Sequence, residues 1–132
     1  MDKIIRVKIV TPINVVFDKQ AQEVIMPGEL GEFGVLPGHE LLIASLKAGL
    51  TKITVGNSVF KYFVYSGLAE VTATNVNIIT EFAIDTSNLQ AHEIAGKIAL
   101  LKREINEEND DTKKDIIKLD MARYESLLTC IE

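Results

Sequence analysis

A sharp change in residue types near position 84 constrains the fold of this chain more than any other feature of its sequence. All 11 valines lie before residue 77, all three prolines lie before residue 38, and seven of the eight glycines lie before residue 68. Valine favours half-buried strands, and glycine and proline mark the turns between them. The sequence therefore predicts a β-rich module over residues 1–84 and a helical module over residues 85–132.

The first module consists of short apolar runs separated by turn residues. Ile5, Val7 and Ile9 alternate with basic residues, as the two faces of a half-buried strand require. Gly56-Asn57 follows another alternating run and predicts a tight hairpin turn, and residues 68–82 predict a last hairpin. Many short antiparallel strands with close turns are typical of a β-sandwich or a flattened barrel.

The second module carries two narrow apolar stripes with helical spacing. The first stripe runs from Ile94 to Ile105 at steps of 4, 3 and 4, and the second runs from Ile117 to Ile131 at steps of 4, 3, 4 and 3. Residues 106–111 form a short polar connection, which predicts an antiparallel helical hairpin and an α+β protein. Two helices that share one seam bury too little surface to be firmly stable alone. We therefore expect the hairpin to depend on the sandwich or on another protein.

Each predicted helix is preceded by a capping-box pattern. Ser87 stands three residues before Gln90, and Thr112 stands three residues before Asp115. In such a box the hydroxyl and the later side chain satisfy backbone N–H groups of the first helical turn. The sequence therefore predicts that Ser87 and Thr112 cap the two helices.

Charge and cysteine content exclude several classes of protein. The chain carries 14 Lys and Arg against 19 Asp and Glu, a net charge of −5, which argues against sequence-independent nucleic-acid binding. Cys130 is the only cysteine, so no internal disulfide can form. The chain lacks an apolar run of about 18 residues, and its first ten residues alternate like a strand instead of a signal peptide. We expect a soluble intracellular protein.

The sequence holds few groups that could carry out catalysis or bind a metal. His39 and His92 stand 53 positions apart without ligand spacing around either, so no metal site is predicted. Glu29 and Glu32 form a carboxylate pair that a solvated loop explains more simply than acid–base catalysis. A hydrolase that uses His39 with Glu32 is the weakest hypothesis, because no third group orients the imidazole.

A glycine-rich segment carries a specific resemblance. Residues 26–39 read Met-Pro-Gly-Glu-Leu-Gly-Glu-Phe-Gly-Val-Leu-Pro-Gly-His, and residues 41–50 continue Leu-Leu-Ile-Ala-Ser-Leu-Lys-Ala-Gly-Leu. Pro-Gly at 27–28 and at 37–38 predicts a type II turn at each end. The segment resembles the epsilon subunits of bacterial-type ATP synthases, and residues 65–71 and 76–80 agree with that family. The alternative is a free-standing β-sandwich adaptor, which leaves the residue order of 26–50 unexplained.

The resemblance implies a ten-stranded β-sandwich followed by a two-helix hairpin, in a non-catalytic subunit of the rotor. The sandwich, residues 1–84, would grip the gamma subunit, and its glycine-rich loop would rest on the c-ring. The subunit would then couple proton-driven rotation to ATP synthesis at the cytoplasmic face of the bacterial inner membrane, attached only through the complex. The matching loop positions are Glu29, Glu32, Phe33 and His39. Two roles stay open for His39, a partner contact and a turn-stabilising residue.

For the hairpin, residues 85–132, the resemblance implies a regulatory element. It would extend into the catalytic alpha and beta subunits and inhibit ATP hydrolysis. Its candidate contacts with an acidic surface there are Lys102, Arg103, Lys114 and Lys118.

Some members of the family bind ATP on this tail through Ile-Asp, two residues, Arg and Ala. Here Asn88 and Leu89 replace the arginine and the alanine, so the guanidinium that would pair with a phosphate is missing. We therefore expect no functional cofactor or ATP site, and Glu81, Asp85 and Arg123 are left as candidates for its remnant.

Overall fold

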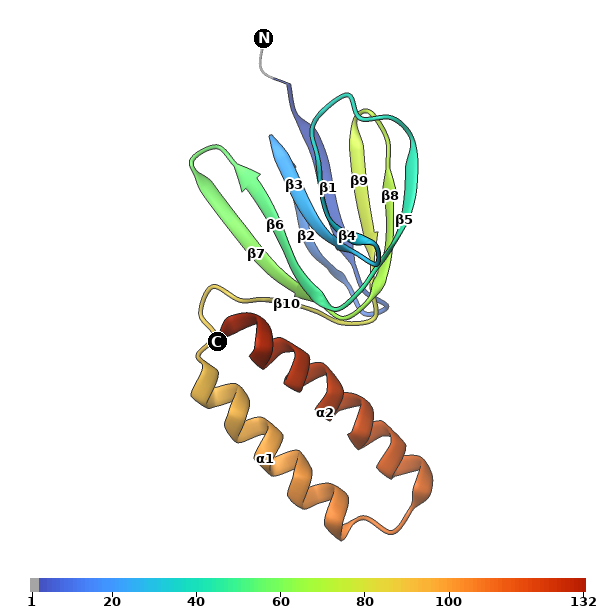
Figure 1. Cartoon of the computed structure of the whole chain (residues 1–132), viewed down its shortest axis with the longest axis vertical. Coiled ribbons are helices and arrows are strands. Elements are labelled where there is room, and N and C mark those ends of the chain that lie inside the picture. Colours follow the sequence, from blue (N-terminus) through green and yellow to red (C-terminus); the bar gives the residue numbers. More distant parts are fainter. Residues whose placement is uncertain (1–2) are drawn as a thin grey trace. The chain divides into compact units, whose positions relative to one another are not determined.

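The alternating runs of the sequence become strands in the computed structural model, which describes residues 3–132. Over that range, ten strands are followed by two helices (Figure 1). They are β1 Ile5–Val10, β2 Val15–Ala21, β3 Glu23–Gly28, β4 Gly31–Val35, β5 Leu42–Leu46, β6 Gly49–Val55, β7 Ser58–Val64, β8 Gly67–Val71, β9 Asn75–Ile79, β10 Ala83–Asp85, α1 Ala91–Glu107 and α2 Asp111–Ile131. The predicted α+β class, a ten-stranded sandwich followed by a two-helix hairpin, is confirmed.

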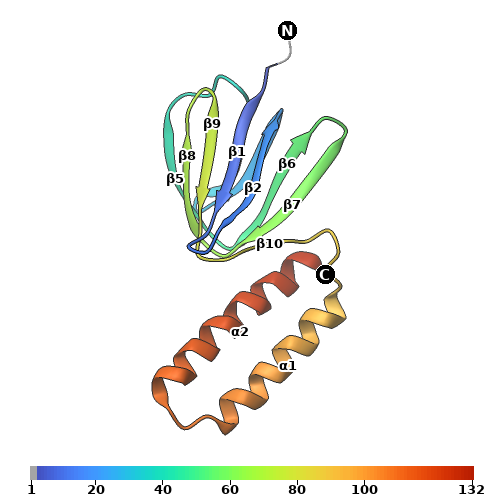
Figure 2. The same cartoon turned by 180° about the vertical axis from the view of Figure 1, so that it is seen from behind.

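The strands form two layers. Strands β5, β8, β9, β1 and β2 lie side by side in one layer (Figure 2), and β4, β3, β6, β7 and β10 form the other. The layers join at one corner, where Gly28 of β3 pairs with Leu46 of β5. Strand β1 pairs antiparallel with β2 but parallel with β9. The first strand of the chain therefore has a partner on each side, and one of these partners, β9, is among the last strands of the sandwich in the sequence.

The space between the layers is filled by the inward-facing residue of each alternating pair. Ile5, Val7 and Ile9 of β1 are fully buried, as their spacing predicted. Phe17 of β2 reaches across to the other layer, where its ring lies edge-on at 5.5 Å from Phe60 and 5.4 Å from Tyr62. This aromatic cluster joins the two layers along β2 and β7.

Contacts within the chain divide it into two units. The first unit ends at Ser87, and the second comprises Asn88–Glu132. In the second unit, α1 and α2 run antiparallel (Figure 1). The predicted stripe of α1 is buried at Ile94, Ile98 and Leu101, whereas the buried residue of α2 is Leu127, which the predicted stripe did not include. The ammonium of Lys97 lies 5.9 Å from the ring centre of Tyr124 and adds a polar contact between the helices.

Both predicted capping boxes are wrong. Helix α1 begins after Gln90, whose side chain makes no capping hydrogen bond, and the Ser87 N–H donates to Asp85 Oδ1 at 2.9 Å. Helix α2 is capped by Asp110, whose carboxylate accepts the N–H of Thr112 at 2.9 Å. A carboxylate one residue before the helix reaches these N–H groups better than a hydroxyl inside its first turn, and it also interacts favourably with the helix dipole.

Candidate functional site

The tight turn between β3 and β4 presents two side chains at one end of the sandwich. Gly28 pairs with Gly31, so Glu29 and Leu30 alone form the loop between the strands. Gly31 has a φ of +133°, a conformation that glycine adopts readily. The predicted type II turn at Pro27-Gly28 is therefore wrong. Both residues belong to β3, and the chain reverses two residues later.

Gly28 brings the two strands of this turn together. A Cβ atom at Gly28 would lie 2.7 Å from the Gly31 carbonyl oxygen and 2.9 Å from the ring of Phe33. The ring therefore lies against the backbone of Gly28, where a larger residue would displace it. This contact fixes Phe33, one of the predicted site residues, beside the turn.

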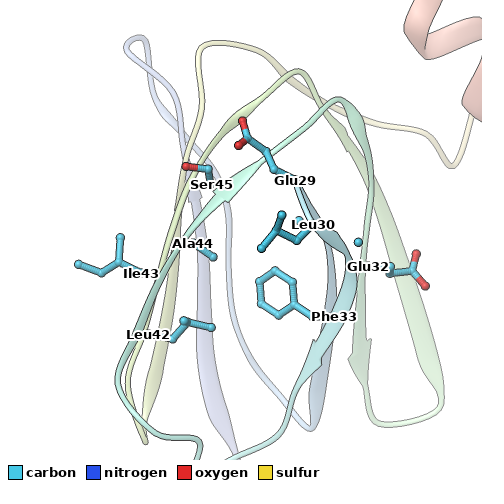
Figure 3. Close-up of a pocket in the computed structure, with 10 residues that line it drawn as sticks. Glu29, Leu30, Glu32, Phe33, Leu42, Ile43, Ala44 and Ser45 are labelled. Atoms are coloured by element: carbon cyan, nitrogen blue, oxygen red, sulfur yellow. The ribbon is translucent and has the colours of Figure 1, made fainter.

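A groove of about 610 Å³ lies between this turn and β5. Strand β4 pairs only with β3, and β5 pairs with β8 and at one position with β3, so the two edges leave an opening. Figure 3 shows Leu30, Phe33 and Leu42 turned toward the groove, while Ile43 points away from it. The groove is lined by Gly28, Glu29, Leu30, Gly31, Glu32, Phe33, Leu42, Ile43, Ala44 and Ser45. We call it the β4–β5 groove; it offers an apolar floor with the Glu29 carboxylate at its rim, while the Glu32 side chain points away from it on the other side of β4 (Figure 3).

His39 ends a second turn of the glycine-rich segment. Its N–H donates to the Leu36 carbonyl at 3.2 Å, and Gly38 has a φ of +87°, so the turn predicted at Pro37-Gly38 is confirmed. The imidazole Nδ1 lies 2.7 Å from the Glu40 carbonyl oxygen. These bonds favour the turn-stabilising role of His39, and no hydrogen bond to Glu32 appears among the described residues. The hydrolase hypothesis therefore lacks its required pair.

A second apolar surface lies on the outer face of the layer formed by β5, β8, β9, β1 and β2. Leu68 of β8 pairs with Ile79 of β9, which in turn pairs with Val10 of β1, so the three side chains form a row. Leu68 is 37% and Ile79 is 47% exposed. Around this row lies a hollow of about 450 Å³, the outer-face groove, lined by Val10, Thr11, Pro12, Ser66, Gly67, Leu68, Ile79, Thr80 and Glu81.

No motif in the sequence pointed to the outer-face groove, although one signal was present. Ile78-Ile79 interrupts the alternation of β9, so one of the two side chains must face outward. Ile78 is fully buried and Ile79 is exposed. An apolar residue on the outward side of several neighbouring strands is typical of a surface that another protein covers.

An ion pair lies on the same outer face, further from the groove. Arg6 donates two hydrogen bonds to Asp18, at 2.8 and 3.0 Å. The hydrogen bond from Arg6 lowers the pKa of the Asp18 carboxyl. Because both groups are exposed to solvent, the pair orients the strands β1 and β2 more than it stabilises them.

The remaining predicted site residues do not come together in one place. Glu81 lines the outer-face groove, and the Asp85 carboxylate accepts the Ser87 N–H. Arg123 pairs with Asp120 at 3.5 Å within α2. The four basic candidates of the hairpin are Lys102 and Arg103 on α1 and Lys114 and Lys118 on α2.

Within residues 3–132, no cluster of three or more His, Cys, Asp or Glu side chains could hold a metal ion. In that same range neither helix is long and apolar enough to cross a membrane.

Comparisons with known proteins agree with each other. The family described as ATP synthase, Delta/Epsilon chain, beta-sandwich domain matches residues 4–86. The chain is 47% identical over 112 residues to the ATP synthase epsilon chain of Rickettsia felis, which covers 83% of this chain and all of that one. It is 44% identical over 108 residues to the epsilon chain of Rickettsia bellii, covering 80% of this chain and all of that one.

Two solved structures share the fold. A chain in the cryo-EM structure of the Euglena gracilis mitochondrial ATP synthase, OSCP/F1/c-ring, superimposes with a TM-score of 0.69 at 19% identity, covering 96% of this chain and 80% of that one. A chain of the Tetrahymena thermophila mitochondrial ATP synthase central stalk and c-ring gives a TM-score of 0.56 at 15% identity, covering 89% of this chain and 96% of that one. At these identities the likeness concerns the fold alone.

Proposed function

The chain belongs to the ATP synthase delta/epsilon family, and from this premise we propose that it is a non-catalytic epsilon subunit in the central stalk of a rotary ATP synthase. The observation that carries the proposal is the presence of two separate apolar surfaces on one small sandwich. A stalk subunit that transmits rotation must hold one partner on the shaft and another at the membrane, and two surfaces meet that need. As an epsilon chain, the protein is a subunit of a membrane-associated enzyme complex.

The β4–β5 groove and its turn are the proposed contact with the c-ring. Leu30 is fully exposed at the tip of the turn, and Phe33 and Leu42 form an apolar floor behind it. Glu29 at the rim, and Glu32 on the other side of β4, favour a partner that carries basic residues among apolar ones. Of the predicted site residues, we propose Phe33 as the apolar contact and the two glutamates as the charged ones.

The outer-face groove is the proposed contact with the gamma subunit. Its row of Leu68, Ile79 and Val10 runs across three strands of a rigid sheet, which suits a partner that must carry torque without sliding. Its position on the other side of β5 from the β4–β5 groove leaves both partners room to bind together.

The helical hairpin is the proposed regulatory element. Lys102, Arg103, Lys114 and Lys118 would meet acidic groups of the alpha and beta subunits when the hairpin extends and blocks ATP hydrolysis. The hairpin's narrow seam supports this role, because a marginally stable element is the kind that a partner can shift. We further propose that the subunit lies at the cytoplasmic face of a bacterial inner membrane, attached through the complex.

Purification of the tagged chain from detergent-solubilised membranes tests the proposed function. We expect the wild-type chain to recover the gamma, alpha and beta subunits and the c-ring. Leu30→Asp should lower the recovery of the c-ring relative to gamma by roughly tenfold, the usual effect of a charge at the centre of an apolar contact. Val59→Asp, which changes an equally apolar exposed residue on β7, serves as the control. Recovery of none of these subunits by the wild-type chain would leave the adaptor alternative.

Removal of the hairpin tests the regulatory role. Thr86 is bound to the sandwich, because its N–H and its hydroxyl both donate to the Lys61 carbonyl, at 3.0 and 2.8 Å. A chain that ends after Thr86 should therefore fold, assemble and support ATP synthesis, while the ATP hydrolysis rate of the complex rises several-fold. Steady-state hydrolysis and proton pumping in membrane vesicles measure this. An unchanged hydrolysis rate in fully assembled complexes would remove the inhibitory role.

A further inference from the structure

The turn between β7 and β8 holds an unusual backbone conformation. Ser66 has a φ of +61°, the only positive φ at a non-glycine residue in the described part of the chain, and Gly67 follows with a φ of +148°. Side chains with a Cβ atom disfavour the left-handed region, so surrounding contacts must hold Ser66 there. Such strained residues gather at sites where the exact position of the backbone matters for function.

The hydroxyl of Thr80 holds this turn in place. It donates to the Ser66 carbonyl at 2.6 Å, and the Thr80 side chain is buried, with 4% of the residue exposed. The turn also lies against the end of β9, because a Cβ at Gly67 would overlap the carbonyl oxygen of Ile79. The strained turn is therefore clamped between the end of β9 and one buried hydroxyl.

Thr80 also binds the segment that leads into β10. Its hydroxyl accepts the Phe82 N–H at 3.4 Å, and the Phe82 carbonyl in turn accepts the Tyr65 N–H at 3.0 Å. The Thr80 N–H donates to the Val10 carbonyl at 3.0 Å. One residue thus joins the end of β1, the turn before β8 and the chain that continues toward the hairpin. These bonds also explain why the second strand of the hairpin predicted over residues 68–82 ends at Ile79.

These bonds lie beneath the outer-face groove, because the Thr80 side chain is buried. Val10, Ser66 and Thr80 all line the groove, and so do the exposed residues Leu68 and Ile79, which belong to the strands that these bonds hold in place. We propose that Thr80 is a positioning residue: its hydroxyl sets the shape of the outer-face groove and links the binding of gamma there to the anchorage of β10. This inference rests on the proposed function, since it takes gamma as the occupant of the groove.

A second buried threonine shows that burial alone does not require such bonds. Thr51 of β6 is fully buried, and its hydroxyl has no hydrogen-bond partner. The two residues share side-chain chemistry and burial but differ in their bonds. Thr51 is therefore the matched control for Thr80.

Affinity measurements with full-length variants test the role of the hydroxyl. The probe is the purified gamma subunit of the same synthase. Thr80→Val, which keeps the shape and removes the hydroxyl, should weaken gamma binding about tenfold, a factor that corresponds to one lost hydrogen bond. Thr80→Ser should restore the affinity to within about twofold, and Thr51→Val should leave it unchanged. Wild-type affinity in Thr80→Val, or equal loss in Thr80→Ser, would overturn the inference.

Hydrogen exchange of the wild-type chain tests the link to β10 without any substitution. If the groove and β10 are joined through Thr80, saturating gamma should slow exchange of the Tyr65, Phe82 and Ile84 amides about tenfold. Unchanged exchange at these amides in a chain that binds gamma would overturn the link. Failure of the wild-type chain to bind gamma at all would instead overturn the proposed function, so the two results are distinguishable.

Discussion

Replacement of Phe17 by alanine should lower the free energy of unfolding of the sandwich by about 3 to 5 kcal/mol, the usual cost of removing a buried aromatic ring. The side chain is nearly fully buried, and its ring is the one that contacts both Phe60 and Tyr62 on the opposite layer. Its removal leaves a cavity between the layers and breaks two edge-on ring contacts. Because small domains are stable by only about 5 to 15 kcal/mol, this loss is a large share of the total.

Urea unfolding followed by circular dichroism measures this effect. Ile13→Ala provides the control, because Ile13 lies almost fully exposed in the turn between β1 and β2 and should change stability by less than about 0.5 kcal/mol. A Phe17→Ala variant that unfolds within about 1 kcal/mol of the wild-type chain would show that the aromatic cluster does not join the layers.

Replacement of Gly67 by alanine should cost about 3 kcal/mol, because two independent penalties apply. The φ of +148° is close to inaccessible for residues with a Cβ atom, and the added Cβ would overlap the Ile79 carbonyl oxygen and lie 3.1 Å from the Thr80 Cβ. Neither contact atom belongs to a flexible side-chain end, so the backbone itself must shift.

Replacement of Gly96 by alanine is the matched substitution, and its expected effect on stability has the opposite sign. It lies within α1, and a Cβ there would meet no atom within 4 Å. Gly96→Ala should therefore stabilise the hairpin by about 0.5 to 1 kcal/mol. Thermal unfolding of both variants measures the pair, and a Gly67→Ala variant as stable as the wild-type chain would contradict the strained-turn geometry.

Local patterns in the sequence predicted a β-rich module followed by a helical hairpin, whereas the ten-stranded sandwich was implied by the family resemblance. The alternation of Ile5, Val7 and Ile9 predicted a half-buried strand because side chains of a strand alternate between its faces. The spacing of Ile94, Ile98 and Leu101 predicted the buried side of α1 for the analogous reason in a helix. Both signals depend only on residues that are close along the chain.

The helix caps and the two grooves could not be predicted from short sequence patterns, because they depend on how distant parts of the chain meet. At the start of α2, Asp110 and Thr112 both had suitable side chains, and only the position at which the chain enters the helix decides between them. The β4–β5 groove arises from two strand edges that are brought together by the Gly28–Leu46 corner, a contact between residues 18 positions apart. The outward orientation of Ile79 follows from sheet register, which the order of strands sets.

The parallel pairing of β1 with β9 has a consequence for the synthesis of the chain on the ribosome. Val7 pairs with Val76, so the first strand emerges about 70 residues before one of its two neighbours exists. At the usual rate of about 5 to 20 residues per second, translation takes about 4 to 14 seconds to supply that neighbour. During this interval β1 pairs with β2 alone, and its other edge keeps unpaired backbone N–H and C=O groups. The edge of β1 therefore stays open until β9 emerges, and the order of synthesis makes completion of this layer a late event.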